Sequence, residues 1–167
     1  MSLFTCGDRA PIPVRARGQH LVVDIHCHLG IPAADAIVQA HYPGPPPGIN
    51  DFTSAKTSEV NRAMFGAMGR TLNTLDTRLA DMDRLGIDVQ ALSPSPGQYF
   101  YYADAETGRD AARAVNDGMA AAVASQPDRF VGMGTVPLQN TELAIAEMRR
   151  CVAELDLRGI EISSNVN

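Results

Sequence analysis

Four short apolar runs alternate with three longer amphipathic segments, and this alternation restricts the possible folds more than any other feature of the chain. The runs are bounded by glycine, proline or polar residues, as buried parallel strands are. We place strands at 21–25, 87–92, 130–136 and 159–163. Strands joined through helices form βαβ units, which build a parallel sheet covered by helices. The sequence therefore predicts an α/β fold, either an open doubly wound sheet or part of a (β/α)₈ barrel.

Apolar residues recur at helical spacing between the later strands. The first helix is expected over 75–85, with Asp76 in its first turn and Gly86 as a left-handed terminator. The second has its apolar face over 112–123 and closes at Pro127, and the third is capped by Asn140 or Thr141. The residues expected to point inward from the third helix are Ala144, Met148, Cys151, Val152 and Leu155.

Residues 31–73 interrupt this regular order. Their periodicity fades around the proline-rich stretch 42–48, so we predict short helical pieces at 34–40 and 58–68. A long irregular stretch inside a small domain is typically functional, and we interpret this one as an insertion that acts as a lid. Residues 1–20 are interpreted as an N-terminal extension, and 21–167 as one partial barrel domain that contains the insertion.

Composition excludes several classes of function. The 167 residues carry a net charge of −5 and are 45% hydrophobic, as expected for a soluble globular unit. No apolar run approaches the roughly 18 residues that span a bilayer, and no secretory signal is visible, so we expect a cytoplasmic protein. Three cysteines without a CxxC pair fit a reducing compartment. No basic cluster exceeds the pair at 149–150, so neither nucleic acid nor an anionic membrane is an expected partner.

The clearest chemical signal is Asp24-Ile25-His26-Cys27-His28 at the end of the first strand. Strict alternation along a strand predicts that Asp24, His26 and His28 project to one side. Two imidazoles two residues apart can ligate one divalent ion, and the carboxylate can orient a ring or a metal-bound water from behind. The alternative is a pair of surface histidines at an exposed strand end.

Two ligands leave a metal site incomplete, because zinc takes three or four protein ligands. His20 lies at the opposite end of the strand and His41 lies in the insertion, so we expect both at the surface. Cys27 faces away from the histidines and is interpreted as a small core residue rather than a nucleophile.

Four segments, taken in order, resemble a known family. They are DIHCHL (24–29), RLADMDRLGIDVQALSPSP (78–96), ARAVNDGMAAAVASQPDRFVGMGTVPLQ (112–139) and LRGIEISSNVN (157–167). The sequence resembles the amidohydrolase-related family typified by aminocarboxymuconate-semialdehyde decarboxylase and the aromatic acid decarboxylases. The resemblance implies a metal-dependent (β/α)₈ barrel in which His26 and His28 are the first two ligands, usually of zinc and sometimes of manganese. It implies that the intact protein decarboxylates a small aromatic or unsaturated carboxylate, with hydrolysis as the alternative.

The sequence departs from that family because the later-strand histidines and the aspartate that complete the metal site are missing. It resembles the N-terminal half of the barrel, about four βα units, and we place no catalytic acid or base within it. An open sheet edge invites pairing, so we expect a homo-oligomer. The rival interpretation is a non-catalytic half-barrel that is stable only through self-association.

Candidate substrate contacts follow the second strand. Tyr99 and Tyr101 belong to a run of four aromatic residues on one loop, and barrel enzymes build their sites from such loops. Ser93 and Asn165 lie at strand carboxyl ends and are further candidates. Three other polar residues occupy similar positions and are more simply interpreted as turn or cap residues: Thr135, Ser163 and Ser164. Arg62 and Arg70 are candidates, by position alone, for the arginine with which the family holds a substrate carboxylate.

Overall fold

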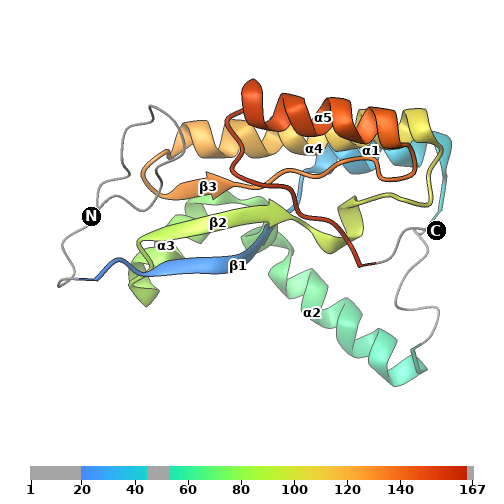
Figure 1. The fold of residues 1–167 in the computed structure, drawn as a ribbon. Coiled ribbons are helices and arrows are strands. Elements are labelled where there is room, and N and C mark those ends of the chain that lie inside the picture. The colour runs from blue at the N-terminus through green and yellow to red at the C-terminus, as the bar shows by residue number, and fades with distance from the viewer. Residues whose placement is uncertain (1–19, 45–52, 165–167) are drawn as a thin grey trace.

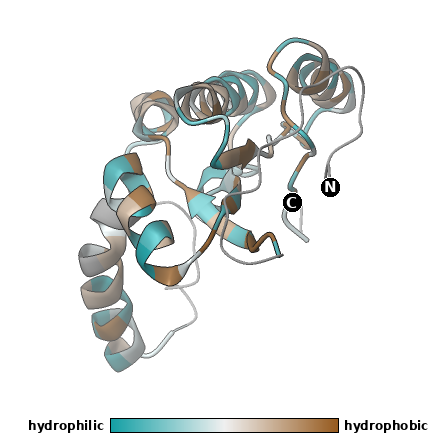
Figure 2. Cartoon of the chain, turned by 90° about the vertical axis from the view of Figure 1, so that its left-hand side faces the viewer, coloured by the Kyte–Doolittle hydropathy of each residue, from teal (hydrophilic) through white to brown (hydrophobic). Residues whose placement is uncertain are grey.

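The computed structural model describes residues 20–44 and 53–164, in which a parallel sheet is flanked by helices (Figure 1). The strands pair in the order β1-β2-β3, with bounds β1 (Val23–Leu29), β2 (Val89–Pro94) and β3 (Phe130–Gly132). Figure 2 shows the helices following one another in an arc along one side of the strands. A doubly wound sheet reverses its strand order and carries helices on both faces, whereas a barrel does neither. Of the two predicted architectures, the structure favours part of a barrel.

Within the described residues, five α-helices and one 3₁₀ turn connect and cover the strands. Their bounds are α1 (Pro32–His41), α2 (Ala55–Asn73), α3 (Leu75–Leu85), η2 (Pro96–Gln98), α4 (Ala105–Ser125) and α5 (Thr141–Ala153). Because β2 and β3 each follow a helix, both crossovers are βαβ units, as the sequence predicts.

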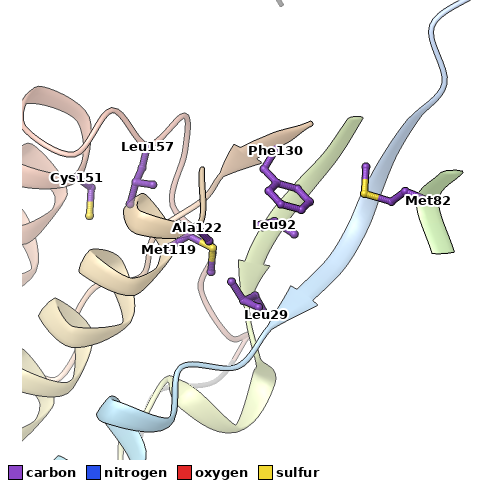
Figure 3. Packing of buried hydrophobic residues seen from close by; sticks show 8 residues of the cluster. All are labelled: Leu29, Met82, Leu92, Met119, Ala122, Phe130, Cys151 and Leu157. Atoms are coloured by element: carbon purple, nitrogen blue, oxygen red, sulfur yellow. The ribbon is translucent and has the colours of Figure 1, made fainter. Parts of the chain in front are cut away.

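The main core lies between the strands and the helices. Leu29, Leu92 and Phe130 come from β1, β2 and β3, and their side chains meet Met82 of α3 and Met119 of α4 (Figure 3). Burying an aliphatic or aromatic side chain of this size contributes roughly 1.5–3 kcal/mol. This packing fixes which face of each strand is covered, and therefore which residues face the other way.

The prediction for α3 is confirmed at both ends. The helix covers Leu75–Leu85 and ends at Gly86, whose φ of 76° is in the left-handed region that glycine adopts without strain. Its apolar spacing favours Leu75, Leu79, Met82 and Leu85 as inward residues, but Leu85 is exposed and Arg78 is buried. An arginine therefore occupies a core position behind the sheet.

Helix α4 begins earlier than the apolar pattern indicates. Asp104 caps it, and its Oδ1 accepts hydrogen bonds from the backbone N–H groups of Glu106 and Thr107, both at 3.0 Å. These bonds hold the pKa of Asp104 well below its usual value. A capping aspartate ahead of an acidic first turn is a recognisable start signal that the apolar spacing alone does not contain.

The inward face of α5 is partly mispredicted. Asn140 is the cap, and Ala144 and Cys151 are buried as expected. Met148 and Val152 are instead 44% and 53% exposed. The inward position between the two buried residues is occupied by Glu147, whose Oε1 accepts a 2.8 Å hydrogen bond from Asn116 Nδ2 of α4. Leu155 lies beyond the helix and packs partly against the core.

Two strands are displaced from their predicted positions. β1 runs to Leu29, which pairs with Pro94, so the histidines lie within the strand rather than beyond it. β2 covers Val89–Pro94 instead of 87–92, and it ends at a proline, which cannot continue a central ladder. β3 is shorter than predicted, ending at Gly132.

The predicted fourth strand at 159–163 forms only in part: Gly134 N–H donates to Gly159 O at 2.9 Å and Gly134 O accepts from Glu161 N–H at 2.8 Å, in parallel pairing. The segment makes one isolated parallel bridge, between Gly134 and Ile160. After Gly134, the backbone groups of Thr135 form hydrogen bonds with a side chain of helix α4 instead of with a neighbouring strand. Thr135 N–H donates to Asn116 Oδ1 at 2.8 Å, and Thr135 O accepts from Asn116 Nδ2 at 2.9 Å. A side chain of α4 therefore takes the groups that a longer ladder would need.

The predicted insertion contains two helices, both longer than predicted. Helix α1 belongs to the packed layer, because Ala34 and Val38 are buried beside α4. Gln98 fixes its start, accepting a 2.9 Å hydrogen bond from Ile31 N–H and donating to Ile31 O at 2.9 Å. Helix α2 is more exposed, and the lid interpretation stays a prediction for it. The division into an extension and a single domain also stays a prediction.

Candidate metal centre

A β-bulge shapes the histidine segment. Asp24 pairs with Gln90 and Cys27 pairs with Leu92, so β1 uses three steps where β2 uses two. One extra residue in a strand lets two neighbouring side chains oppose a single residue of the partner strand. Ile25 and His26 are those two residues, and both are exposed.

The bulge corrects the predicted direction of Asp24. Gln90 and Leu92 are two residues apart and share the face that the helices cover, so Asp24 and Cys27 share it too. The two histidines lie on the other face. Asp24 therefore does not stand beside the rings. Its Oδ1 accepts a 3.2 Å hydrogen bond from the backbone N–H of His26, which supports the bulge from behind.

His28 is held in one tautomer by its neighbours. Its Nδ1 lies 3.0 Å from Pro94 O and 3.0 Å from Ser93 Oγ. A carbonyl oxygen accepts and never donates, so Nδ1 carries the proton. Ser93 Oγ accepts from the same N–H while its own hydroxyl reaches Cys27 O at 3.4 Å. The lone pair of His28 is thereby assigned to Nε2, which is the arrangement of a metal-ligating histidine.

The two rings lie close together. Their centroids are 5.1 Å apart and their planes meet at 86°. Within residues 20–44 and 53–164, no cluster of three or more His, Cys, Asp or Glu side chains is placed to hold a metal ion. His20 and His41 are exposed, as predicted. The donor set that the described chain offers is thus two imidazoles, one of them with its proton fixed on the nitrogen away from the site.

Cys27 behaves as a core residue. It is buried, and its Sγ approaches Ala91 O at 3.3 Å. Burial, assisted by the nearby carboxylate of Asp24, raises the pKa of the Cys27 thiol to about 12. A thiol that stays protonated at neutral pH is a poor ligand and a poor nucleophile.

The aromatic run after η2 divides between two environments. Phe100 and Tyr102 pack against α1. Tyr99 and Tyr101 stack on each other, with ring centroids 5.7 Å apart. Burial raises the pKa of both phenols, and for Tyr99 the carboxylate of Glu161 raises it further. Contact of either tyrosine with a substrate stays a prediction.

The remaining candidates are placed as follows. Ser93 is buried and bonded to His28, so the contact that the structure shows is with the candidate ligand. Arg62 is exposed on α2, where Arg70 also lies. Thr135 is buried and Ser164 is exposed. Asn165 lies outside the described residues.

Sequence reasoning missed Arg78 and Gln90, which lie behind the histidine strand. Arg78 Nη1 donates to Gln90 Oε1 at 3.1 Å, and Gln90 Nε2 donates to Asp24 Oδ2 at 3.0 Å. A signal was present, because Arg78 falls at the inward spacing of α3 between Leu75 and Met82. A charged residue at a core position indicates a buried polar partner.

The sequence pattern of the amidohydrolase family, described simply as "Amidohydrolase", matches residues 23–167. The chain belongs to the amidohydrolase family. This match covers nearly all of the described structure, including the histidine strand and the five α-helices described above. As a member of this family, the chain forms part of a (β/α)₈ barrel, in agreement with the singly wound strand order.

Several of the similar relatives and solved structures are decarboxylases. The chain is 44% identical over 92 residues to 2-amino-3-carboxymuconate-6-semialdehyde decarboxylase of Dictyostelium discoideum, covering 55% of this chain and 26% of that protein. It is similar to the structure of 5-carboxyvanillate decarboxylase from Sphingomonas paucimobilis, with a TM-score of 0.71 and 30% identity over 88% of this chain and 44% of that one. A dihydroxybenzoic acid decarboxylase from Polaromonas sp. JS666 was solved with bound manganese and 2-nitroresorcinol. It matches with a TM-score of 0.60 and 29% identity, over 85% of this chain and 38% of that one.

The chain spans less than half the length of these similar proteins. In the part of the chain that the structure describes, no helix is both long and apolar enough to cross a membrane.

Proposed function

We propose that the intact protein is a metal-dependent carboxy-lyase that removes carbon dioxide from a small aromatic or unsaturated carboxylate. The observation that carries the proposal is the fixed tautomer of His28, whose Nδ1 proton is held by Pro94 O and Ser93 Oγ. This leaves Nε2 as the donor on the face that carries both histidines. Similarity to decarboxylases for three different unsaturated carboxylates supports the lyase reaction over hydrolysis.

His26 and His28 would supply two ligands of a divalent ion. Zinc is the ion expected from the sequence resemblance, and the Polaromonas neighbour carries manganese. Imidazole nitrogen accepts both, so the residues present fit either ion without choosing between them. The further ligands that a complete site needs are expected outside residues 20–44 and 53–164.

The reaction exchanges a carboxylate for a proton. The bond between the carboxylate carbon and the substrate carbon breaks, the electron pair stays on the substrate carbon, and a proton takes the place of carbon dioxide. A conjugated ring bearing a hydroxyl group delocalises this charge. The ion supplies electrostatic stabilisation of substrate oxygen atoms as the charge develops.

The chain's own contribution is to hold the ligand strand rigidly and to shape the loop after β2. Tyr99 is half-buried and Tyr101 is buried, and their rings pack against each other on that loop with planes tilted by 32°. We assign to these two rings the contact with the flat face of the substrate. Ser93 is assigned to the orientation of His28.

Metal titration tests the site. The full chain is titrated with Zn²⁺ and with Mn²⁺ by calorimetry, alongside His26→Ala, His28→Ala and the double variant. His41→Ala is the control, because His41 is equally a histidine but lies exposed at the end of α1. We expect each site variant to bind at least about 10-fold more weakly, since a ligand nitrogen is lost, and the control to match the unmodified chain.

An unchanged stoichiometry in the double variant would refute the assignment of the ligands. The reaction itself is tested by release of carbon dioxide from 5-carboxyvanillate and 2,6-dihydroxybenzoate, using the intact protein loaded with each metal. Hydrolysis of an amide or ester by the loaded protein, without carbon dioxide release from any aromatic carboxylate, would contradict the lyase proposal.

A further inference from the structure

Two arginine side chains are buried beside the sheet and make different contacts. Arg78, on α3, is 5% exposed and lies behind the histidine-bearing part of β1. Arg129 is 3% exposed and lies at the amino ends of the strands, where it donates to Asp88 O and Ile87 O and pairs with Asp83. Burying a guanidinium group costs free energy unless its N–H groups have hydrogen-bond partners. We therefore expect each arginine to fix the position of the groups that it bonds.

Arg78 reaches the histidine strand by two routes. Its Nη2 donates directly to the backbone carbonyl of His28. Its Nη1 donates to Gln90 Oε1, Gln90 Nε2 donates to Asp24 Oδ2, and Asp24 Oδ1 accepts from His26 N–H. One guanidinium is therefore bonded, directly or through two side chains, to the backbone of both candidate metal ligands.

The bulge explains why such support is needed. The extra residue between Asp24 and Cys27 removes regular ladder bonds at the point where His26 must be aimed. The backbone N–H of His26 is bonded to the Asp24 carboxylate instead. If the carboxylate were free to rotate, nothing in this network would fix the amide of His26. Gln90 and Arg78 hold the carboxylate from the helix side.

We propose that Arg78 is a positioning residue that sets the spacing and direction of the His26 and His28 rings through the Gln90–Asp24 chain. It lies on the face opposite the rings and does not ligate the ion. This inference rests on the proposed function in that the rings are taken to bind a metal. The bonding of the His26 amide, however, is a property of the metal-free chain and is measured separately.

The experiment compares Arg78→Met with Arg129→Met, two variants that each remove a buried guanidinium group. The Arg129 side chain bonds the carbonyls of Ile87 and Asp88 rather than the histidine strand, so it serves as the control. Stability of each is measured by urea unfolding, so that a general loss of structure is accounted for. Amide hydrogen exchange of His26 and His28 is measured by NMR in the metal-free chain, and Zn²⁺ affinity by competition with a chromophoric chelator.

We expect Arg78→Met to accelerate exchange at His26 by about 10-fold or more relative to Arg129→Met, because exchange reports local opening. We expect its Zn²⁺ affinity to fall about 10- to 100-fold, as for loss of groups that orient ligands, and that of Arg129→Met to change less than about 3-fold. Gln90→Met, which cuts only the Asp24 branch, should show the same changes to a smaller extent. It also serves as the test variant if Arg78→Met does not fold.

Equal exchange and equal affinity in the Arg78 and Arg129 variants would overturn the inference. So would a loss in both variants that simply follows their loss of stability. If the unmodified chain fails to bind Zn²⁺, His26 and His28 do not form a metal site in this chain by themselves, and the exchange of the His26 amide still decides whether Arg78 positions this strand.

Discussion

The β1–β2 side of the sheet and the edge beyond β3 both combine backbone pairing with buried polar side chains, but they use these side chains differently. Between β1 and β2 the ladder continues to Leu29 and Pro94, and buried polar side chains reinforce it around the bulge. Beyond β3 the pairing with β2 ends, a short parallel pairing joins 132–134 to 158–161, and Asn116 then takes the backbone groups of Thr135. In the first region side chains support strand pairing, and in the second a side chain takes over where the pairing ends.

This difference shows that buried polar groups have separate structural roles in the two regions. At the histidine strand they fix a geometry that the bulge would otherwise leave loose. At the far edge they join α4 to β3, and α5 keeps an apolar stripe of Ile145, Met148 and Val152 exposed. The first region thus reinforces the strand that carries the candidate ligands, and the second leaves an apolar stripe exposed.

The largest expected effect separates the shared core from the exposed edge. Phe130→Ala removes a fully buried ring that touches both regions and should destabilise the chain by about 3–5 kcal/mol. Val152→Ala, in the exposed stripe of α5, should change stability by less than about 0.5 kcal/mol. Urea unfolding of both variants checks this. Similar losses would mean that the stripe is covered in solution, which sedimentation would reveal as self-association.

A second prediction concerns the replacement of pairing at the far edge. Asn116→Ala leaves Thr135 N–H and Glu147 Oε1 without the amide that bonds them, so we expect a loss of about 2 kcal/mol. Amide exchange at Thr135 should accelerate, while exchange at His28 in β1 should stay as in the unmodified chain. Faster exchange at both sites would show that the two regions are not independent.

A third prediction sharpens the histidine side. Ser93→Ala removes one acceptor from His28 Nδ1 but leaves Pro94 O, so Zn²⁺ affinity should fall by about 10-fold with little loss of stability. Ser125→Ala, whose hydroxyl bonds Ala122 O at the end of α4, is the matched control and should leave affinity unchanged. An unaltered affinity in the Ser93 variant would remove its positioning role.

The smallest expected effect is a pH dependence from the core thiols. Burial raises the pKa of Cys27 and of Cys151 to about 12, from about 9 in the unfolded chain. Between these values the unfolded chain loses the protons that the folded chain keeps, so stability should fall as pH rises above about 9. Urea unfolding at pH 8 and pH 10 checks the direction. Cys27→Ala should flatten the slope, and an unchanged slope would contradict the assignment.

The fold was predictable from local signals where one signal dominates. Helix α3 could be placed from its spacing and Gly86, and the α/β class from the alternation of strands and helices. The failures have a common cause in polar side chains at buried positions. Glu147 displaced Met148 and Val152 from the inward face of α5, and Asn116 shortened β3. Their partners lie 19 to 31 residues away, beyond the range of periodicity.

The candidate site could be predicted only where its pattern is local in the sequence. The HxH spacing identified His26 and His28 because period-two alternation is a local rule. The bulge reversed the direction of Asp24, and no local pattern signals a bulge between Asp24 and Cys27. The support from Gln90 depends on strand register, 66 residues along the chain from Asp24. Strand pairing over a long sequence distance therefore determines which side chains support the candidate ligands from the opposite face.

The most direct test of this account is the ¹⁵N chemical shifts of the histidine rings, recorded while Zn²⁺ is added to the labelled chain. The account predicts that His28 carries its proton on Nδ1 before addition and that its Nε2 shifts on binding, together with the ring of His26. His20 and His41 should not respond. A response at His20 or His41 without one at His28, or a proton on His28 Nε2 in the metal-free chain, would contradict the central claim.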